Sequence, residues 1–487
     1  MLRSWSNTLV SVRQVTQRNA GRKTAGIDGE VALTSQARAE LVVRVHRTRS
    51  SWQPRAVKRV HIPKAGDTKK LRPLGIPVIT DRCHQARVRN ALEPEWEARF
   101  EPRSYGFRPG RGCHDAIEAI YSTLSRRNAR RVWILDADLA GAFDTIDHDH
   151  LLATIGGFPA RGMIAGWLQA GVVETGKGYA PTEEGTPQGG VISPLLLNVA
   201  LHGLEGAAGV RYHTGARAGQ TVAGSPALIR YADDLVACCH SRQQAEQVKA
   251  RLAGWLAPRG LAFNEDKTRI VHLAEGFDFL GFNVRRYRNG KLLIKPSAPA
   301  VRRLKRRLAS EMRALRGSNV TAVLAKLVPI TRGWAAYYRT VVSSKVFRSL
   351  DHYVWKLLYK WAKHSHGNKT GSWILNRYFA KFNKSRNDRW VFATATAAPT
   401  CPGSPGLPSS GTPWSRAAHP RMTPPWPGTG PHGGAWSTPR SAPTRCACPP
   451  GRTGAVRCAG TTCSPPSSHP NPRSSGNDGG YRSPGGR

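Results

Sequence analysis

The sequence predicts an α+β fold, because short apolar segments of strand length alternate with longer segments of helical period. Two observations favour strands that carry acids. The apolar run 132–135 is followed at once by acidic residues, and the pair Asp233–Asp234 separates two further apolar runs, which is typical of a β-hairpin. A third observation is the segment 299–365, which is basic, aromatic and helical in period. We therefore expect a sheet backed by helices and followed by a helical region.

The first part of the chain predicts basic helices and one hairpin. Residues 1–50 follow a mostly helical pattern. Apolar and basic positions then alternate along a segment that prolines and glycines interrupt. This pattern predicts strands at 59–63 and 74–77 joined by a lysine-rich loop. Residues 81–127 predict helices on both sides of the loop 104–109.

The middle of the chain continues in the same way. A short apolar run bounded by turn residues predicts a strand, and an amphipathic run of ten residues or more predicts a helix. The expected helices are 148–170, 191–206 and 243–257, and the expected strands are 132–135, 228–231, 235–238, 277–284 and 291–295.

The charge balance indicates a polyanionic partner. Lys and Arg number 73 against 31 Asp and Glu, which gives a formal net charge of +42 and a pI near 10.9. Such a charge repels itself in a compact protein unless a polyanion neutralises it. Nucleic acid is the expected partner, because each phosphate contact releases counterions and adds affinity. The alternative, a merely basic protein, fits poorly with basic residues spread along the whole chain.

The chain shows no sign of export or of membrane insertion. Residues 1–20 contain no continuous apolar core, and no run of about 18 apolar residues occurs, so we expect no signal peptide and no membrane contact. The nine cysteines lack the paired spacing of a zinc site and predict free thiols. These features predict a cytoplasmic protein of bacterial type, held at the nucleoid by nucleic acid.

The composition changes near Ala397. Beyond it there is no Lys, Ile or Phe, and Pro, Gly, Ser, Thr and Arg dominate. Residues 397–487 cannot bury enough apolar surface to fold, so we expect a disordered tail. We favour a GC-rich gene read in the wrong frame over a natural tail or a zinc module.

The acidic residues suit a pair of divalent cations. Asp136 and Asp138 end one apolar run, and Asp233 and Asp234 form the tip of the hairpin. Adjacent acids repel each other and have little structural purpose in an apolar hairpin. Nucleotidyl transfer uses two cations about 4 Å apart, and Mg²⁺ prefers carboxylate oxygens. For the hairpin pair taken alone, a solvated turn is the alternative.

Two further motifs accompany these acids. Asp138 opens the segment DLAGAFD, which ends at Asp144, and the segment GTPQGGVISP spans residues 185–194. The glycines and prolines of the second segment let the backbone approach a flat ligand closely, and Gln188 offers an amide to it.

With these motifs in view, the chain resembles group II intron-encoded reverse transcriptases/maturases over residues 20–395. Each motif alone is weak, but their occurrence together and in the family's order is specific. The matching segments are RPLGIP (72–77), Asp81-Arg82 with Gln85, LEP (92–94), SYGFRP (104–109), DADLAGAFDTIDH (136–148), GTPQGGVISPLL (185–196), RYADD (230–234), NEDKT (264–268), FLGF (279–282) and RGW (332–334) with Tyr337-Tyr338.

The resemblance implies a right-hand polymerase with fingers, an antiparallel palm sheet of split βαβ type backed by helices, and a helical thumb. The expected parts are a basic N-terminal extension (1–50), fingers (51–130), a palm with the catalytic motifs (131–290), a thumb/maturase RNA-binding domain (291–396) and the tail (397–487). The tail would then be a frameshifted remnant of a DNA-binding/endonuclease region, whose cysteine and histidine pattern is not recognisable.

The resemblance also implies a metal site. Asp138, Asp233 and Asp234 are expected to be catalytic and to hold two Mg²⁺ ions, joined by the backbone carbonyl of Leu139. Phe143 is expected to lie under the incoming sugar and to reject a 2′-hydroxyl, with a simple core phenylalanine as the alternative. Asp136 and Asp144 are left as supporting acids.

Further residues are implied to bind the deoxynucleoside triphosphate (dNTP). Gln188 is expected to contact the nucleotide of the nascent base pair. Arg72 and a lysine of the hairpin are expected to hold the triphosphate, with Lys64 as first choice and Lys69 or Lys70 next. Lys267 is expected near the pyrophosphate as a general acid. For each of these cations a solvated or structural role is the alternative.

The thumb helices are expected to bind RNA, because Arg and Lys meet phosphates and aromatic rings stack on unpaired bases. Each aromatic taken alone is more often a core residue. The cations chosen for this surface are Arg302, Arg303, Lys305, Arg306, Arg307 and Arg332.

The implied reaction is the addition of dNTPs to a primer on an RNA template, with release of pyrophosphate. The expected partners are the group II intron RNA, which the protein would also help to splice and to carry into new sites, and the DNA target and primer. A homodimer is left open. Three alternatives remain: a retron or diversity-generating reverse transcriptase, a maturase that only binds RNA, and an inactive relic.

Overall fold

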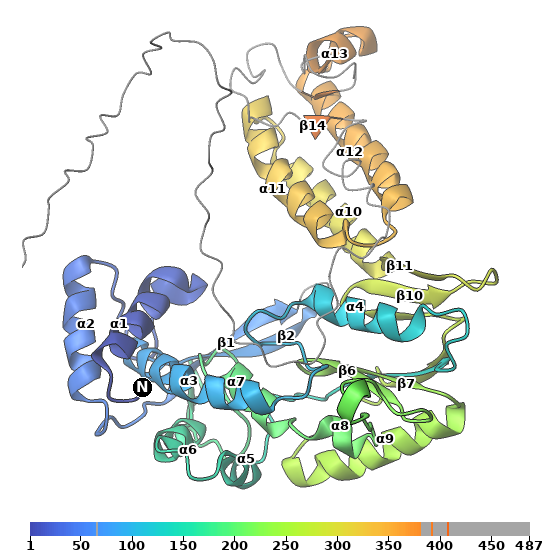
Figure 1. Cartoon of the computed structure of the whole chain (residues 1–487). Coiled ribbons are helices and arrows are strands. Elements are labelled where there is room, and N and C mark those ends of the chain that lie inside the picture. The colour runs from blue at the N-terminus through green and yellow to red at the C-terminus, as the bar shows by residue number, and fades with distance from the viewer. Residues whose placement is uncertain (65–66, 381–390, 393–406, 409–487) are drawn as a thin grey trace, which may run out of the picture. The chain divides into compact units, whose positions relative to one another are not determined.

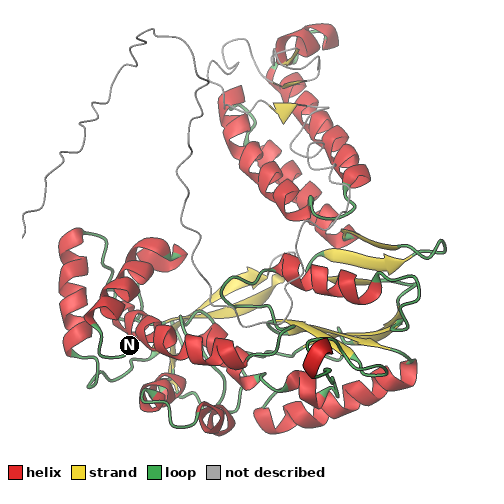
Figure 2. Ribbon diagram, in the orientation of Figure 1, coloured by secondary structure: helices red, strands yellow, loops and turns green. Residues whose placement is uncertain are grey.

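The computed structural model describes residues 1–64, 67–380, 391–392 and 407–408. Helices and strands alternate along the chain, which confirms the predicted α+β class (Figures 1 and 2). No helix in these ranges is long and apolar enough to cross a membrane. The four cysteines in the described part, Cys83, Cys113, Cys238 and Cys239, are free thiols, as predicted.

Three helices at the N-terminal end share a small core. They are α1 (Trp5–Arg13), α2 (Ser35–Arg47) and α3 (Ile79–Arg99). Side chains of Ser4 and Thr34 cap the first two helices by accepting backbone N–H groups, as residues before a helix commonly do. One π turn (Gln14–Arg18) and one 3₁₀ turn (Ala20–Lys23) continue α1 toward the next segment.

The predicted basic hairpin belongs to a larger sheet, the outer sheet. Strands β1 (Val57–Lys64) and β2 (Asp67–Ile76) pair antiparallel, as expected. Beyond β1 lie two strands that the sequence did not predict, β4 (Val172–Glu174) and β5 (Gly178–Ala180), and the order is β2-β1-β4-β5. The parallel β1–β4 pair joins the hairpin to a segment more than 100 residues away.

The central sheet has four antiparallel strands in the order β6-β7-β3-β8. Their apolar residues alternate between two cores, since neighbouring side chains of a strand point to opposite faces. One face packs with α4 (Cys113–Leu124) and the other with α9 (Arg242–Leu256) (Figure 1). The strands are β3 (Trp133–Asp138), β6 (Ala227–Tyr231), β7 (Asp234–Cys239) and β8 (Arg269–His272).

Two predicted helices are each broken in two. The segment 148–170 forms α5 (His148–Ile155) and α6 (Arg161–Gln169), because Gly156 ends the first helix with a φ of 67°. The segment 191–206 forms α7 (Ser193–Ala200) and a single turn, α8 (Leu204–Ala207). Two short 3₁₀ turns, Gly215–Arg217 and Ala257–Arg259, complete this part of the chain.

A second antiparallel sheet precedes the C-terminal helices. The single strand predicted at 277–284 is two strands, because the chain reverses at Leu280 and Gly281, which have φ angles of 50° and 82°. The sheet has the order β11-β10-β9, with β9 (Phe277–Phe279), β10 (Phe282–Arg286) and β11 (Leu292–Pro296).

The basic C-terminal region is helical, as predicted. In α10 the residues Leu304, Leu308 and Met312 recur every fourth position and are buried, while the arginines between them face solvent. The four helices are α10 (Ala298–Ala314), α11 (Val320–Tyr338), α12 (Ser344–Ser365) and α13 (Gly371–Tyr378).

Three two-residue strands follow: β12 (Phe379–Ala380), β13 (Val391–Phe392) and β14 (Leu407–Pro408). Of the predicted tail 397–487, the structure describes only β14, which pairs with β13. The remainder of that segment lies outside the described residues.

Candidate active site

Three aspartates from distant parts of the chain lie at one end of the central sheet. Asp138 is the last residue of β3 and Asp234 the first of β7, and the two are direct partners in the antiparallel register. Their side chains are hydrogen-bonded, and Asp233 lies in the two-residue turn that joins β6 to β7. The structure thus places together the three acids that the sequence singled out.

The three carboxyl groups repel one another in a partly buried setting. Burial raises the pKa of Asp234 to about 7, with further contributions from Asp233 and Asp138. Burial also raises the pKa of Asp233, with Asp138 adding to it, while Arg72 and Lys267 oppose the shift. A site that disfavours ionised carboxylates in this way gains stability from a bound cation.

A lysine occupies part of this negative field. The Nζ atom of Lys267 lies 2.5 Å from Oδ2 of Asp138, although the lysine side chain is 62% exposed. Two residues earlier on β3, Asp136 forms a similar pair with Arg269, at 3.0 Å from Nε to Oδ2. Burial raises the pKa of Asp136, and Arg269 opposes the shift. Both strand acids therefore have a basic partner on the surface.

The donor set suits a hard divalent cation, but it is not a closed cage. Among the described residues, no group of three or more His, Cys, Asp or Glu is already arranged to hold a metal ion. Mg²⁺ sites built for nucleotides are commonly open, because phosphate oxygens and waters complete the coordination. All the side-chain donors here are carboxylate oxygens, which fits Mg²⁺ better than a softer metal.

The backbone carbonyl of Leu139 is turned toward the same place. The N–H of Asn264 donates to the Asp138 carbonyl, and the N–H of Ala140 donates to that of Ala262, so Leu139 and Phe263 form a non-hydrogen-bonded pair. In such a pair the carbonyl points away from the opposite strand. The Leu139 carbonyl is thus directed to the β7 side, where Asp233 and Asp234 lie.

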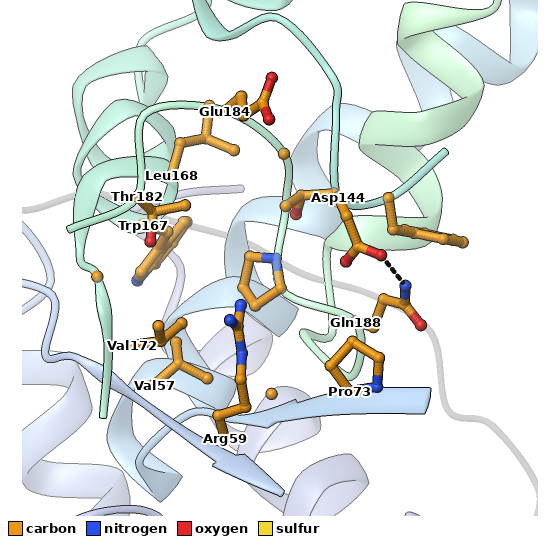
Figure 3. A pocket seen from close by; sticks show the side chains of 16 residues that line it. Val57, Arg59, Pro73, Asp144, Trp167, Leu168, Val172, Thr182, Glu184 and Gln188 are labelled. Carbon is orange, nitrogen blue, oxygen red and sulfur yellow. Dashed lines mark hydrogen bonds between the residues drawn. The ribbon is translucent and has the colours of Figure 1, made fainter. Parts of the chain in front are cut away.

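Beside the acids, a glutamine links two charged residues. The amide nitrogen of Gln188 donates to Oδ2 of Asp144 at 2.8 Å, and its oxygen accepts from Nε of Arg72 at 2.7 Å. Gln188 and Asp144 also border a cavity of about 50 Å³ between the outer sheet and the 185–188 loop, with Arg59 on its β1 side (Figure 3). Asp144, expected only as a supporting acid, fixes the direction of the amide.

Phe143 lies in a core and also at the wall of the cavity. The ring is 8% exposed and belongs to the core on the α9 side of the central sheet. It also borders the cavity and meets Phe107 edge to face, at 6.1 Å between ring centroids. Because the ring is both buried and at a cavity wall, only a variant can distinguish a core role from a role in nucleotide binding.

The remaining predicted residues lie elsewhere. The side chains of Lys64, Lys69 and Lys70 fall outside the described part of the structure, and their role stays a prediction. On α10 the side chains of Arg302, Arg303, Arg306 and Arg307 are exposed, as is Arg332 on α11. Lys305 differs from them, because it is half-buried with Nζ 5.3 Å from the centre of the Tyr353 ring.

The raised pKa of Asp234 predicts a pH-dependent stability. Between its ordinary pKa of 3.8 and about 7, the folded chain keeps a proton that the unfolded chain releases. The folded state then binds more protons, so the free energy of unfolding of the metal-free protein falls as pH rises through this range. Urea unfolding in a chelator at a series of pH values measures the slope.

The variant Asp234→Asn serves as the control for this slope. It has no proton to lose at this position, so its unfolding free energy is expected to fall less steeply over the same pH range. Since a metal ion needs the ionised carboxylate, added Mg²⁺ is expected to stabilise the unmodified chain more at the alkaline end. Equal slopes for both proteins would contradict the assignment.

Three family models match successive parts of the chain. A family model described as "Reverse transcriptase (RNA-dependent DNA polymerase)" matches residues 62–284. The "Group II intron, maturase-specific domain" matches residues 301–379, and the "N-terminal domain of reverse transcriptase" matches residues 1–45. The three matches follow one another along the chain and leave the segment beyond 379 without a counterpart among them.

Several curated proteins are similar to the chain. Protein YkfC of Escherichia coli (strain K12) is 33% identical over 323 residues, which cover 60% of this chain and 84% of that protein. The group II intron-encoded protein LtrA of Lactococcus lactis subsp. cremoris is 38% identical over 192 residues, 38% of this chain and 31% of LtrA. Maturase-like protein 1 of Euglena gracilis is 26% identical, and the match covers 68% of this chain and 67% of that protein. The chain thus spans most of YkfC but under a third of LtrA.

Proposed function

Since the chain belongs to the family of group II intron-encoded reverse transcriptases/maturases, we propose that it extends a primer on an RNA template and assists the splicing of its intron RNA. The observation that carries the polymerase part is the meeting of Asp138 with Asp233 and Asp234 at the end of the central sheet. Mutual repulsion of their charges gives these side chains a reason to bind cations.

In this proposal Asp138, Asp233, Asp234 and the Leu139 carbonyl hold two Mg²⁺ ions. When bound, the ions supply activation of the primer 3′-hydroxyl and neutralise the leaving pyrophosphate. Lys267 would turn from Asp138 toward the leaving pyrophosphate and donate a proton to it. Its exposure of 62% leaves it free to make this movement.

The dNTP is proposed to lie between the acids and the outer sheet. Arg72 binds the triphosphate as a cation, and Gln188 presents its amide to the nucleotide. In the structure these two side chains bind each other, so the incoming nucleotide would exchange a protein contact for its own. Lys64 is proposed as a second cation for the triphosphate.

RNA binding is proposed for the exposed cations of α10 and for Arg332 of α11. Residues 298–378, which form α10–α13, contain only two acids, Glu311 and Asp351, so this segment carries a net positive charge. The proposed parts are an N-terminal extension (1–50), fingers (51–130), a palm (131–290), a thumb/maturase domain (291–396) and a tail (397–487). Insertion into a DNA target, a nucleoid-associated location and a homodimer extend the same proposal.

A maturase that only binds RNA is the second candidate. The family match over 301–379 supports it independently of the polymerase motifs. Such a protein has no use for three repelling carboxylates at the end of the central sheet, yet all three are present here. This favours a protein that performs both tasks.

Primer extension on a poly(rA) template with an oligo(dT) primer tests the polymerase. The full chain is expected to incorporate dTTP in the presence of Mg²⁺, and Asp233→Ala is expected not to. Retained RNA binding by the variant distinguishes a lost reaction from a misfolded protein. Equal incorporation by both proteins, or none by either, would leave only the RNA-binding function.

Replacing Phe143 by alanine is expected to admit ribonucleotides. If the ring blocks the 2′-hydroxyl, its removal lowers the preference for dNTPs over ribonucleotides by roughly 10²-fold. The substitution also removes a buried ring, which costs about 3 kcal/mol of unfolding free energy. Competition between dTTP and UTP in primer extension measures the preference.

Phe100→Ala is the matched control for this variant. Phe100 is 7% exposed and belongs to the same core, but it does not border the cavity. A similar loss of stability with an unchanged sugar preference is expected for it. If Phe143→Ala behaves in the same way as Phe100→Ala, the ring is simply a core residue.

A further inference from the structure

A buried arginine reaches the turn that carries the acids. Arg230 lies at the fourth position of β6, is 3% exposed, and directs its guanidinium back toward the β6–β7 turn. Its Nη1 atom donates to the carbonyl oxygen of Ala232 at 3.1 Å and to Oδ1 of Asn198 at 2.9 Å. Burial of a charged guanidinium group costs free energy unless hydrogen bonds or an opposite charge compensate for it. The two hydrogen bonds of Arg230 supply part of this compensation.

Asn198 connects this arginine to a loop on the other side of the turn. It lies in α7, is fully buried, and its amide nitrogen donates to the Gly106 carbonyl at 2.9 Å. The N–H of Tyr105 donates to the Arg230 carbonyl at 2.9 Å, so the loop is also bound to β6 directly. One asparagine therefore links a helix, a loop and the hairpin.

Gly106 packs directly against the backbone of the turn. A Cβ atom placed on Gly106 would lie 2.2 Å from the backbone nitrogen of Ala232, closer than any real contact. Only glycine leaves room for the turn at this point. The loop and the turn thus support each other by direct backbone contact as well as through Asn198.

The supported residue is in a conformation that it does not prefer. Ala232 has a φ of 57°, the left-handed region that costs a non-glycine residue about 1 kcal/mol. Such a conformation persists when the surroundings hold it. Arg230 binds the carbonyl of Ala232, which is part of the peptide bond to Asp233, so the contact bears directly on the placement of that acid.

We propose that Arg230 and Asn198 are positioning residues that hold the Ala232–Asp233 peptide so that Asp233 and Asp234 can share cations with Asp138. This rests on the proposed function, in which these acids are the metal ligands. The guanidinium suits the task because the two N–H bonds of its planar Nη1 group point in fixed directions, one toward α7 and one toward the turn. A lysine at position 230 would keep the charge and lose this geometry.

The test uses the full chain with Asn198→Leu, Arg230→Lys and Asp233→Asn. Asn7→Leu is the matched control, because Asn7 is also a buried helical asparagine whose amide donates to backbone carbonyls, but it lies in α1 among the N-terminal helices. Mn²⁺ binding without nucleic acid, followed by electron paramagnetic resonance, reports the site apart from activity. Primer extension at varied Mg²⁺ and dNTP then gives kcat and KM, and thermal unfolding gives Tm.

For Asn198→Leu and Arg230→Lys we expect Mn²⁺ affinity to fall about tenfold, the equivalent of one lost buried hydrogen bond. The expected change in kinetics is a lower kcat and a higher Mg²⁺ requirement, with KM for dNTP within about twofold. Asn7→Leu is expected to lower Tm and to leave Mn²⁺ affinity unchanged.

Two results would overturn different statements. If Asn198→Leu and Asn7→Leu lose Tm equally and both bind Mn²⁺ like the unmodified chain, Arg230 and Asn198 are merely structural. If Asp233→Asn itself binds Mn²⁺ normally, the metal site of the proposed function is wrong. If Arg230→Lys does not fold, Asn198→Leu alone decides, since it leaves the arginine and its bond to Ala232 in place.

Discussion

Asp138→Asn is expected to lower kcat for dNTP incorporation on the order of 10³-fold or more, because it removes a charge that the proposed cations need in the transition state. The carboxylate faces Asp234 across β3 and β7 and bonds to Lys267, so the amide fits the same space. RNA affinity is expected to stay within about twofold, since the substitution lies in the sheet and not on the basic helices. Single-turnover primer extension with filter binding of RNA measures both.

Asp136→Asn provides a close control. Asp136 lies on the same strand and the same face as Asp138, and it too is paired with a surface cation. The Asp136 side chain is 16% exposed, and the Asp138 side chain is 18% exposed. Its loss is expected to cost less than about tenfold in kcat, since it has no partner at the β6–β7 turn. Comparable losses in both variants would show that a general change in charge is responsible.

Neutralising Arg303, Arg306 and Arg307 together is expected to weaken RNA binding on the order of 10²-fold near physiological salt. The three side chains are exposed on one face of α10, because positions three and four apart are neighbours on a helix. The plot of log affinity against log salt is expected to lose about 2 to 3 units of slope, close to one per phosphate contact. Glutamine variants measured by filter binding at several salt concentrations give both quantities.

The control triple is Arg99, Arg242 and Lys249. Each of these surface cations is already paired with a glutamate: Glu95, Glu246 and Glu265 respectively. Their replacement by glutamine removes the same formal charge and is expected to change the salt slope by less than about one unit. If both triples weaken binding equally, net charge and not the α10 face governs RNA affinity.

Local patterns were enough for most of the fold. Three of the four central strands were predictable because alternate residues, such as Ile134 and Leu135, supply two different cores, and the acids stand where the apolar runs stop. The fourth, β8, was not predicted. Strands β4 and β5 were not predictable, because three residues carry no periodicity and their partner β1 is more than 100 residues away. The same holds for the helix breaks, which depend on single glycines such as Gly156.

The candidate site, too, could be predicted only in part from the sequence. Residue types and motifs indicated the three acids, but their pairings depend on long-range contacts. Lys267 bonds to Asp138 over 129 positions, and Arg72 bonds to Gln188 over 116. Arg230 belongs to the RYADD motif, but nothing in the local sequence distinguishes a buried arginine from the many arginines that contact solvent or RNA.

The contact between Gly106 and Ala232 also limits how polymerases of this kind can be recombined. The loop at 104–109 and the turn at 231–234 are separated by more than 100 residues, yet their backbones touch without space for one methyl group. A hybrid enzyme that takes these two segments from different parents would have to match them to a fraction of an ångström. Crossover points that keep both segments from one parent should therefore yield far more working hybrids than points between them.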